Sequence, residues 1–218
     1  MDAFINFELH DNSFLLTAGR SIFWEDEKTL ILSDLHLGKA GHFRKAGIAI
    51  PQTIFKEDMH RLISQLQYFK PSRLLIVCDL FHSTDNKEHE FFLKWRNDLS
   101  GIDMHLVKGN HDILKDDWYK KAGIDTFDQD LVISNFVFTH DFETCDSYAG
   151  HYCFSGHIHP GIRLRGLGKQ LIQLPCFYFG EKYAVLPAFG KFTGTYPVDP
   201  QPGDSIFALV SGNIMKIQ

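Results

Sequence analysis

Residues 29–36 read TLILSDLH, an apolar run that ends in Asp34 and His36. A continuous apolar run of this length is typical of a strand that is buried on both faces. The same arrangement returns in RLLIVCDL at 73–80 and in IDMHLVKGNHD at 102–112. Because functional groups of α/β sheets gather beyond the carboxyl ends of strands, these runs predict one sheet edge that carries polar chemistry.

Amphipathic helices are predicted between these strands. Pro51 opens the first helix, in which apolar residues from Phe55 to Phe69 recur at spacings of three and four, and Pro71 ends it. The second helix is predicted over 88–99. The intervening strands are predicted at Thr29–Ser33, Arg73–Cys78 and Ile102–Val107. This alternation is the pattern of βαβ units on a parallel or mixed sheet.

The pattern of apolar and polar residues changes from about Leu131. Short apolar runs are separated there by Gly, Pro, Asn and Asp, which predicts consecutive, mostly antiparallel strands. A helix-bearing half followed by a strand-rich half predicts two packed sheets with helices outside. No repeat, low-complexity tract or linker divides the 218 residues, so one domain over 1–218 is expected.

Composition narrows the class of protein. Hydrophobic residues make up 44% of the chain and charged residues 22%, which excludes a disordered chain and a small disulfide scaffold. No apolar run approaches the roughly 18 residues of a membrane-spanning helix. The opening residues MDAFINFELHDNS carry acids where a secretory signal would be basic. The four cysteines show no CxxC spacing, so a cytoplasmic protein without a membrane partner is expected.

The charge balance limits how this chain could bind phosphate. A formal net charge of -5 lacks the basic field that drives non-specific nucleic-acid binding. Any recognition of phosphate must therefore be local, through a metal ion or a small basic patch.

Five short polar clusters each follow an apolar run. They are Asp34-x-His36, Asp79 with His82, Asn110-His111-Asp112, His140-Asp141 and His157-x-His159. Residues i and i+2 of an extended chain point the same way, so the first and last clusters can each aim two ligands at one place. A single strand-end Asp or His is more often a cap or a turn residue, but five clusters in series predict a metal site.

The mixture of ligands indicates which ions would bind. Imidazoles together with carboxylates suit Mn²⁺, Fe, Zn²⁺ or Co²⁺ better than Ca²⁺ or Mg²⁺. Four imidazoles, two carboxylates and one amide are too many for one ion, and they fit two ions about 3.5–4 Å apart with a carboxylate between them. Such a pair activates a hydroxide and clamps phosphate oxygens, so a phosphate ester is the expected substrate.

These clusters, read with Gly109 and Gly156, resemble the motif series of the calcineurin-like metallophosphoesterases. The order of the motifs matches, and they span positions 34 to 159. The resemblance implies a four-layer α/β/β/α sandwich of two mixed sheets with two divalent metal ions, of which Mn²⁺ is the first choice. The chain departs from the family at Cys78, where glycine usually precedes the bridging Asp.

The resemblance also implies roles for individual residues. Asp34, His36, Asp79 and His159 would surround one ion, and Asp79, Asn110, His140 and His157 the other. His111 would be the general acid, with Asp112 orienting it. His82 is either a partner behind Asp79 or an ordinary loop residue.

Two longer stretches are similar to a narrower group. SDLHLGKAGHFRKAGIAIP (33–51) and SGHIHPGIRLRGLGKQ (155–170) look like the bacterial ligase-associated DNA-damage-response members of this superfamily. These are endonucleases or phosphodiesterases grouped with an ATP-dependent DNA ligase, a helicase and an exonuclease, which would be the partners here.

Basic residues follow the first and last metal motifs. Lys39, His42 and Arg44 follow the first pair, and Arg163 and Arg165 follow the last. Their guanidinium and ammonium groups are candidates for binding substrate phosphates, with solvated loop charge as the alternative.

Three functions remain open from the sequence. The first is hydrolysis of a phosphodiester, in DNA, by metal-activated hydroxide. The second is hydrolysis of nucleotides, phosphomonoesters or phosphoproteins. The third is a docking scaffold without activity, which the complete ligand set disfavours. If single strands bind, Phe43 and the run Phe177–Phe179 are the residues to examine for base stacking.

Overall fold

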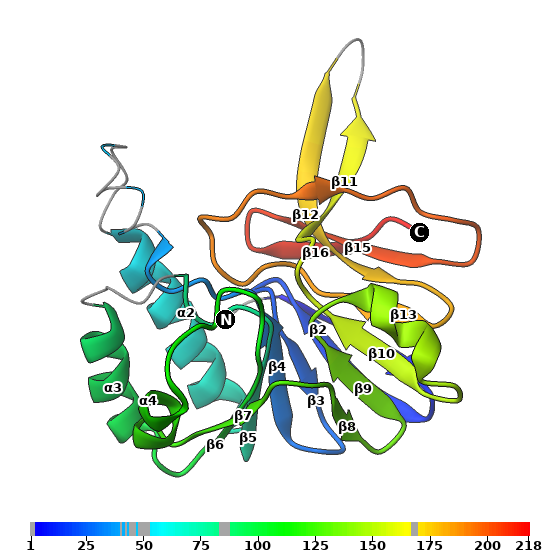
Figure 1. Cartoon of the computed structure of the whole chain (residues 1–218). Helices are drawn as coiled ribbons and strands as arrows, with labels where there is room; N and C mark the ends of the chain where they lie inside the picture. The colour runs from blue at the N-terminus through cyan, green and yellow to red at the C-terminus, as the bar shows by residue number, and fades with distance from the viewer. Residues whose placement is uncertain are drawn as a thin grey trace.

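The computed structural model describes residues 3–39, 41, 43, 47, 53–82, 88–166 and 170–218, with only the backbone of Glu88. Two β-sheets pack face to face, and the α-helices lie outside the first of them (Figure 1). The predicted α/β architecture of two mixed sheets is confirmed.

The first sheet follows the order of the chain from edge to edge. Its strands are β1 (Phe4–Leu9), β2 (Asn12–Thr17), β3 (Ile22–Trp24), β4 (Thr29–Ser33), β5 (Arg73–Val77), β6 (Asp103–Val107) and β7 (Ile124–Phe127). Strands β4 to β7 are parallel, as the βαβ pattern predicts, and β4 has the predicted bounds. Strands β1 to β3 are antiparallel and were not predicted.

The helices cover one face of this sheet. They are α2 (Thr53–Phe69), α3 (Glu88–Asp98) and α4 (Asp116–Lys121). The residues of α2 and α3 agree with the predicted helices to within a residue or two, although Pro51 lies outside the described residues. Alternation along the buried strands explains the packing: Leu30 and Leu32 belong to the cluster beneath the helices, and Ile31 to the cluster between the sheets.

The second sheet is built from the other half of the chain. Its strands are β8 (Leu131–Ile133), β9 (Phe136–Thr139), β10 (Tyr152–Ser155), β11 (Pro160–Arg165), β12 (Leu171–Phe179), β13 (Tyr183–Val185), β14 (Tyr196–Pro197), β15 (Ser205–Val210) and β16 (Asn213–Lys216). Most neighbours pair antiparallel as predicted, whereas β9, β10 and β13 at the centre run parallel, as does the short pair of β11 and β14. The parallel pairing brings the ends of β9 and β10 to the same edge.

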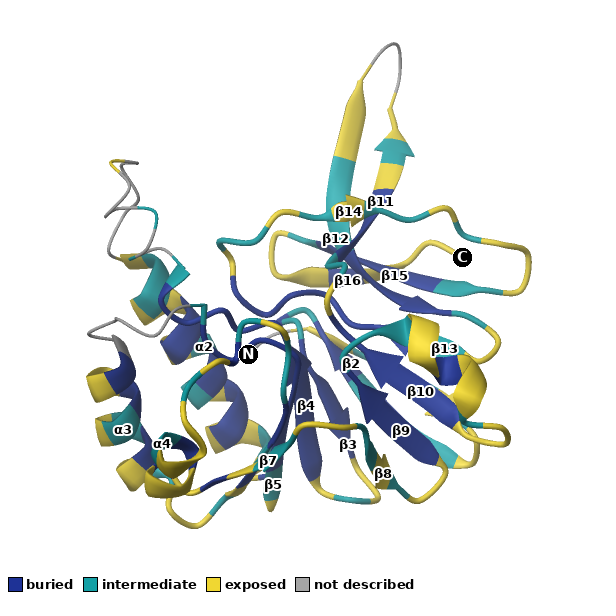
Figure 2. Ribbon diagram, in the orientation of Figure 1, coloured by how far each residue is buried: buried dark blue, intermediate teal, exposed yellow. Residues whose placement is uncertain are grey.

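Aromatic side chains fill the space between the two sheets. Trp24, Phe136 and Phe154 are fully buried there, and the rings of Phe138 and Phe154 stack with centroids 5.4 Å apart. Figure 2 shows this band of buried residues in the strands. Removal of these rings from water is the main driving force that holds the two sheets together.

The far face of the second sheet carries a thinner layer. Within the described residues it bears the 3₁₀-helix η1 (Phe142–Ser147), in which Cys145 packs on Val137 and Cys153. Beyond the body of the molecule projects the hairpin of β11 and β12 (Figure 1). No described helix combines the length and the apolar character needed to cross a membrane.

Candidate metal centre

The loops after β4 and β5 lie side by side at the carboxyl edge of the first sheet. The amide of His36 donates to the carbonyl oxygen of Asp79 at 2.9 Å, and Leu37 continues the contact by a bridge to Phe81. The parallel pairing of β4 and β5 therefore extends past the strand ends. As a result, two of the predicted polar clusters face one another.

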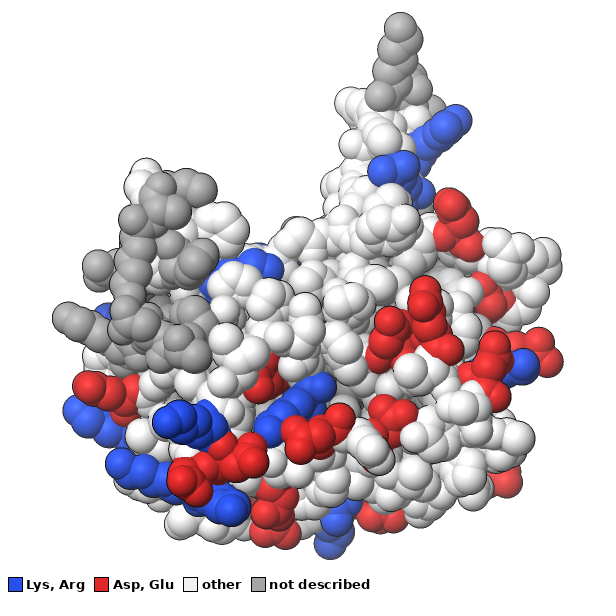
Figure 3. Space-filling model, in the orientation of Figure 1, with Lys and Arg blue, Asp and Glu red and all other residues white. Residues whose placement is uncertain are grey.

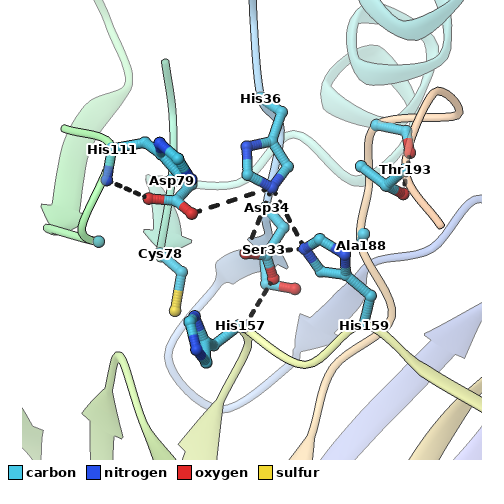
Figure 4. Close-up of polar contacts among 12 residues, drawn as sticks. Ser33, Asp34, His36, Cys78, Asp79, His111, His157, His159, Ala188 and Thr193 are labelled. Carbon is cyan, nitrogen blue, oxygen red and sulfur yellow. Dashed lines mark hydrogen bonds and ion pairs between the residues drawn. The ribbon is translucent and has the colours of Figure 1, made fainter. Parts of the chain in front are cut away.

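Three of the predicted ligands form a compact group. The ligand atoms of Asp34, His36 and His159 all lie within 4.8 Å of one another. His159 Nε2 is 3.4 Å from Asp34 Oδ1 and 3.2 Å from His36 Nε2 (Figure 4). These spacings suit three ligands of one metal ion, so this cluster could hold a cation.

Asp79 adds a second carboxylate to this group. Its Oδ2 lies 3.9 Å from His36 Nε2, the same distance that separates that nitrogen from Asp34 Oδ1. The other oxygen of each carboxylate is held by the backbone: Asp79 Oδ1 accepts from the His111 amide at 2.9 Å, and Asp34 Oδ2 from the His157 amide at 3.1 Å. Each carboxylate thus has one oxygen fixed and one turned toward the imidazoles (Figure 4).

The electrostatics of the group favour a bound cation. Asp34 Oδ1 is buried and accepts no hydrogen bond from any described residue, which is costly for a carboxylate. Burial, reinforced by the nearby charge of Asp34, raises the pKa of Asp79. Burial, followed by the charge of Lys39, lowers the pKa of His36 to about 2, so this imidazole is neutral and able to bind metal. The residues present therefore fit a divalent metal ion.

His140 and His157 form a second pair beside these ligands. Their ring centroids are 4.4 Å apart. Burial and then the His157 ring lower the pKa of His140, while Asp79 and Asp34 oppose that shift from nearby. Asn110 lies in the adjacent loop and is exposed. Among the described residues, its side chain makes no hydrogen bond to another predicted ligand. The structure thus brings six of the seven predicted ligands together and leaves Asn110 at the rim.

Two glycines permit this close approach. A Cβ on Gly156 would collide with Asp34 Oδ2 and would lie 2.9 Å from Ser33 Cβ. A Cβ on Gly109 would collide with Asp79 Oδ1 and lie 2.6 Å from the Asp79 amide nitrogen. The glycines of the GNHD and GHIH motifs therefore serve the carboxylates directly.

The backbone at the site is strained. Asp34, His36, His157 and His159 all have left-handed conformations, with φ between 48° and 70°. Such a conformation costs about 1–2 kcal/mol for a residue with a Cβ. Strain of this kind is found where a structure holds ligands in a fixed geometry.

Cys78, which stands where the resemblance leads one to expect glycine, also has a left-handed backbone. Its φ is 67°, a value that glycine adopts without strain. Its thiol is fully buried and lies 3.2 Å from the carbonyl oxygen of His140, to which it donates. Burial raises the pKa of the thiol well above its ordinary value, so Cys78 is a neutral packing residue behind the carboxylates.

His111, His82 and His36 lie around one point. The His111 ring is 5.8 Å from that of His36 and 4.7 Å from that of His82. Asp112 is buried, and its carboxylate accepts from the amides of Leu80, Phe81 and Gly109 at 3.1–3.2 Å. Asp112 therefore joins the loops that carry Asp79 and His111.

The predicted basic residues divide into three groups. Lys39 lies beside the centre, because it lines the same pocket as His36. The charges of Asp34 and Asp79 raise the pKa of Lys39, but burial has the larger effect and lowers it. His42 and Arg44 lie outside the described residues. Arg163 and Arg165 are exposed on β11, about 13 and 20 Å along the strand from His159 at roughly 3.3 Å per residue.

A loop that carries no motif supports the ligands from behind. The amide of Phe189 donates to the Ser33 carbonyl at 2.7 Å, and that of Gly190 to the Asp34 carbonyl at 3.1 Å. Arg20 donates to the carbonyl oxygens of Ala188 and Gly190, at 3.1 and 3.3 Å. The sequence offered no signal for this loop, because its contacts are made by the backbone.

The two packed sheets and the Asp–His cluster at their strand ends define a nuclease-like metallophosphoesterase fold. The crystal structure of the nuclease MPE from Pseudomonas putida matches the chain with a TM-score of 0.84 at 26% identity, covering 99% of this chain and 100% of that one. No protein-family model matches the sequence, and no curated protein matches it.

Proposed function

We propose that this protein hydrolyses phosphodiester bonds in DNA with the help of two divalent metal ions. The observation that carries the proposal is the largely buried group of Asp34, His36, Asp79 and His159, in which Asp34 Oδ1 accepts no hydrogen bond from the part of the chain that the structure describes. The similarity to a nuclease supports a nucleic-acid substrate rather than another phosphate ester.

The residues divide between two ions as the resemblance implies. Asp34, His36, Asp79 and His159 would hold one ion, and Asp79, Asn110, His140 and His157 would hold the other. Mn²⁺ is the first choice, and Fe, Zn²⁺ or Co²⁺ suit the same ligands. When bound, two such ions supply an activated water and neutralise charge that develops on the phosphate.

The other side chains handle the proton and the substrate. His111 donates a proton from its imidazole to the leaving oxygen, and Asp112 holds the loop that carries it. Lys39 binds a phosphate oxygen next to the metals, together with His42 and Arg44 of the same segment. Arg163 and Arg165 bind phosphates farther along a polymer, because they lie too far from His159 to touch the one that reacts.

The biological setting follows from the narrower resemblance. We propose a cytoplasmic, single-domain enzyme of the DNA-damage response that works alongside an ATP-dependent DNA ligase, a helicase and an exonuclease. Copurification of these proteins from cells would support this setting, and its absence would leave the chemistry untouched.

Hydrolysis of bis-p-nitrophenyl phosphate tests the chemistry. The wild type should release nitrophenol in the presence of Mn²⁺, and Asp79→Ala and His157→Ala should reduce the rate at least about 100-fold. His151→Ala is the matched control, because His151 is exposed outside the centre. Full activity in the Asp79 variant would show that the site is wrongly assigned, and faster hydrolysis of p-nitrophenyl phosphate would favour a phosphomonoesterase.

A further inference from the structure

An aromatic groove lies on the outer face of the second sheet, where its helical layer is thin. The groove has a volume of about 260 Å³. Its lining includes four aromatic side chains, Phe142, Tyr178, Tyr183 and Tyr196, together with Ile158 and Val198. A concave surface that combines aromatic side chains with a few polar groups is typical of a small-ligand site.

The rings in the groove are arranged as a stack. Phe142 and Tyr183 are 5.0 Å apart with 22° between their planes, and Tyr183 and Tyr178 are 5.8 Å apart with 25° between theirs. Tyr196 is 64% exposed and contributes a further ring at the open side. The groove thus presents aromatic faces to a flat ligand.

The groove adjoins the candidate metal centre. Ile158 stands between His157 and His159 in the chain and forms part of the groove wall. The amide of Tyr196 donates to the carbonyl oxygen of His159 at 2.9 Å, and β14 continues this contact by pairing with the start of β11. A ligand in the groove would therefore lie next to the residue that carries a metal-binding imidazole.

The charge of the groove disfavours a phosphate as its occupant. Asp199 lines it, and the Tyr178 hydroxyl donates to Asp204 Oδ2 at 2.6 Å. No described lining residue is Lys or Arg. Basic side chains are found instead on the projecting hairpin (Figure 3) and at Lys39 beside His36. Carboxylates repel phosphate but accept hydrogen bonds from the amino and imino groups of a nucleobase.

We propose that this groove binds one nucleobase of the substrate, from the nucleotide joined to the phosphorus at the metal centre. The base stacks on Tyr196, while the phosphate remains with the metals and Lys39. The proposal rests on the proposed function, and it adds a specificity site to that reaction. It predicts that the enzyme prefers phosphodiesters that carry a base over otherwise identical ones that do not.

Two pairs of small esters test the groove without any polymer. Thymidine 5′-p-nitrophenyl phosphate and thymidine 3′-p-nitrophenyl phosphate are each compared with the ester of the same sugar that lacks the base. For at least one pair, kcat/KM of the wild type should be at least about fivefold higher with the base, as expected for stacking on an aromatic side chain. Tyr196→Ala should bring that ratio close to one, and Tyr196→Phe should retain it.

Matched variants separate this groove from the rest of the enzyme. Tyr68→Ala removes a tyrosine that is 51% exposed on α2, and it should leave the ratio at the wild-type value. Because the ratio compares two substrates at one centre, damage to the metal site cancels from it. The proposed nucleobase site would be contradicted if Tyr196→Ala left the ratio unchanged, or if the Tyr68 variant lowered the ratio equally. Failure to cleave any of the esters would instead overturn the proposed function on which the groove depends.

Discussion

At the scale of single residues, Gly156 is a position where one added atom should displace a carboxylate of the candidate metal centre. A Cβ there would collide with Asp34 Oδ2 and would also lie 3.1 Å from Cys78 Sγ. We expect Gly156→Ala to weaken Mn²⁺ binding at least about tenfold, since shifts of groups that orient metal ligands have effects of this size. Overpacking should also lower the free energy of unfolding by about 1–3 kcal/mol.

Calorimetric titration with Mn²⁺ measures the affinity, and urea denaturation measures the stability. Gly101→Ala is the control, because a Cβ on Gly101 meets nothing within 4 Å. Equal Mn²⁺ affinities of Gly156→Ala and wild type would contradict the role assigned to the close approach.

His105 gives a pH dependence that is independent of the metal centre. Its side chain on β6 is 19% exposed, and burial, followed by the charge of Arg73, lowers its pKa. Below pH 6.5 the unfolded chain binds a proton at this position that the folded chain does not, so stability falls as the pH falls. The slope from one such group is at most about 1.4 kcal/mol per pH unit.

The check is urea denaturation of the wild type and of His105→Gln between pH 7.5 and pH 5.5. The wild type should lose more stability over this range than the variant, which has no proton to bind at this position. Identical losses would show that His105 titrates alike in the folded and unfolded chains.

The sequence identified the polar residues of the site but not the backbone that holds them. Parallel pairing of β4 and β5 brings Asp34, His36 and Asp79 to one edge, and the packing of the second sheet adds His159. The left-handed conformations depend on contacts with distant segments, as does the burial of Asp34 Oδ1, which accepts no hydrogen bond from any residue that the structure describes. Such contacts leave no local pattern in the sequence.

At the scale of elements, a buried ionic cluster ties α2 to the loop behind the metal ligands. Asp58 accepts from Arg61 at 2.8 Å and from the amide of Lys191 at 3.2 Å. Arg61 also donates to the Phe189 carbonyl oxygen. We expect Asp58→Ala to lower the free energy of unfolding by about 3 kcal/mol, because the partly buried Arg61 would lose its counter-charge.

Glu57 offers a matched control on the same helix. It pairs with Lys191 at 2.9 Å, but both side chains are about half exposed. Glu57→Ala should therefore lower the free energy of unfolding much less than Asp58→Ala does. If urea denaturation finds that both variants lose the same free energy of unfolding, the ionic cluster does not stabilise the attachment of this loop to α2.

The elements that the sequence predicted well are those with strong periodicity. Strand β4 is a continuous apolar run, and helices α2 and α3 have apolar residues at regular helical spacing. Strands β1 and β2 were missed, although His10 and Asp11 join them in a two-residue turn with both residues left-handed. Such turns usually contain Asn or Gly, and their absence hid the hairpin. The parallel centre of the second sheet could not be read from short runs, because strand direction depends on the crossovers between them.

At the scale of the whole molecule, the hairpin of β11 and β12 distinguishes a polymer substrate from a small one. It projects from the body (Figure 1) and carries Arg163 and Arg165, both exposed, with Arg163 Nε donating to Gln173 Oε1 at 3.0 Å. The two side chains alternate with Leu164, so they share one face of the hairpin. They can therefore contact successive phosphates of a strand that reaches the metal centre.

Replacing both arginines by glutamine should weaken the binding of DNA uniformly across sequences. Each lost phosphate contact should also lower the slope of log K against log salt concentration by about one. Fluorescence anisotropy with labelled DNA at several salt concentrations measures both effects, and Ca²⁺ in place of Mn²⁺ would slow cleavage during the measurement. The double variant Lys120→Gln/Lys121→Gln removes the same charge from exposed positions on α4 and should bind like the wild type at every salt concentration. An unchanged slope in the arginine variant would mean that the hairpin does not touch the phosphates, and the substrate would then have to be held at Lys39 and the metals alone.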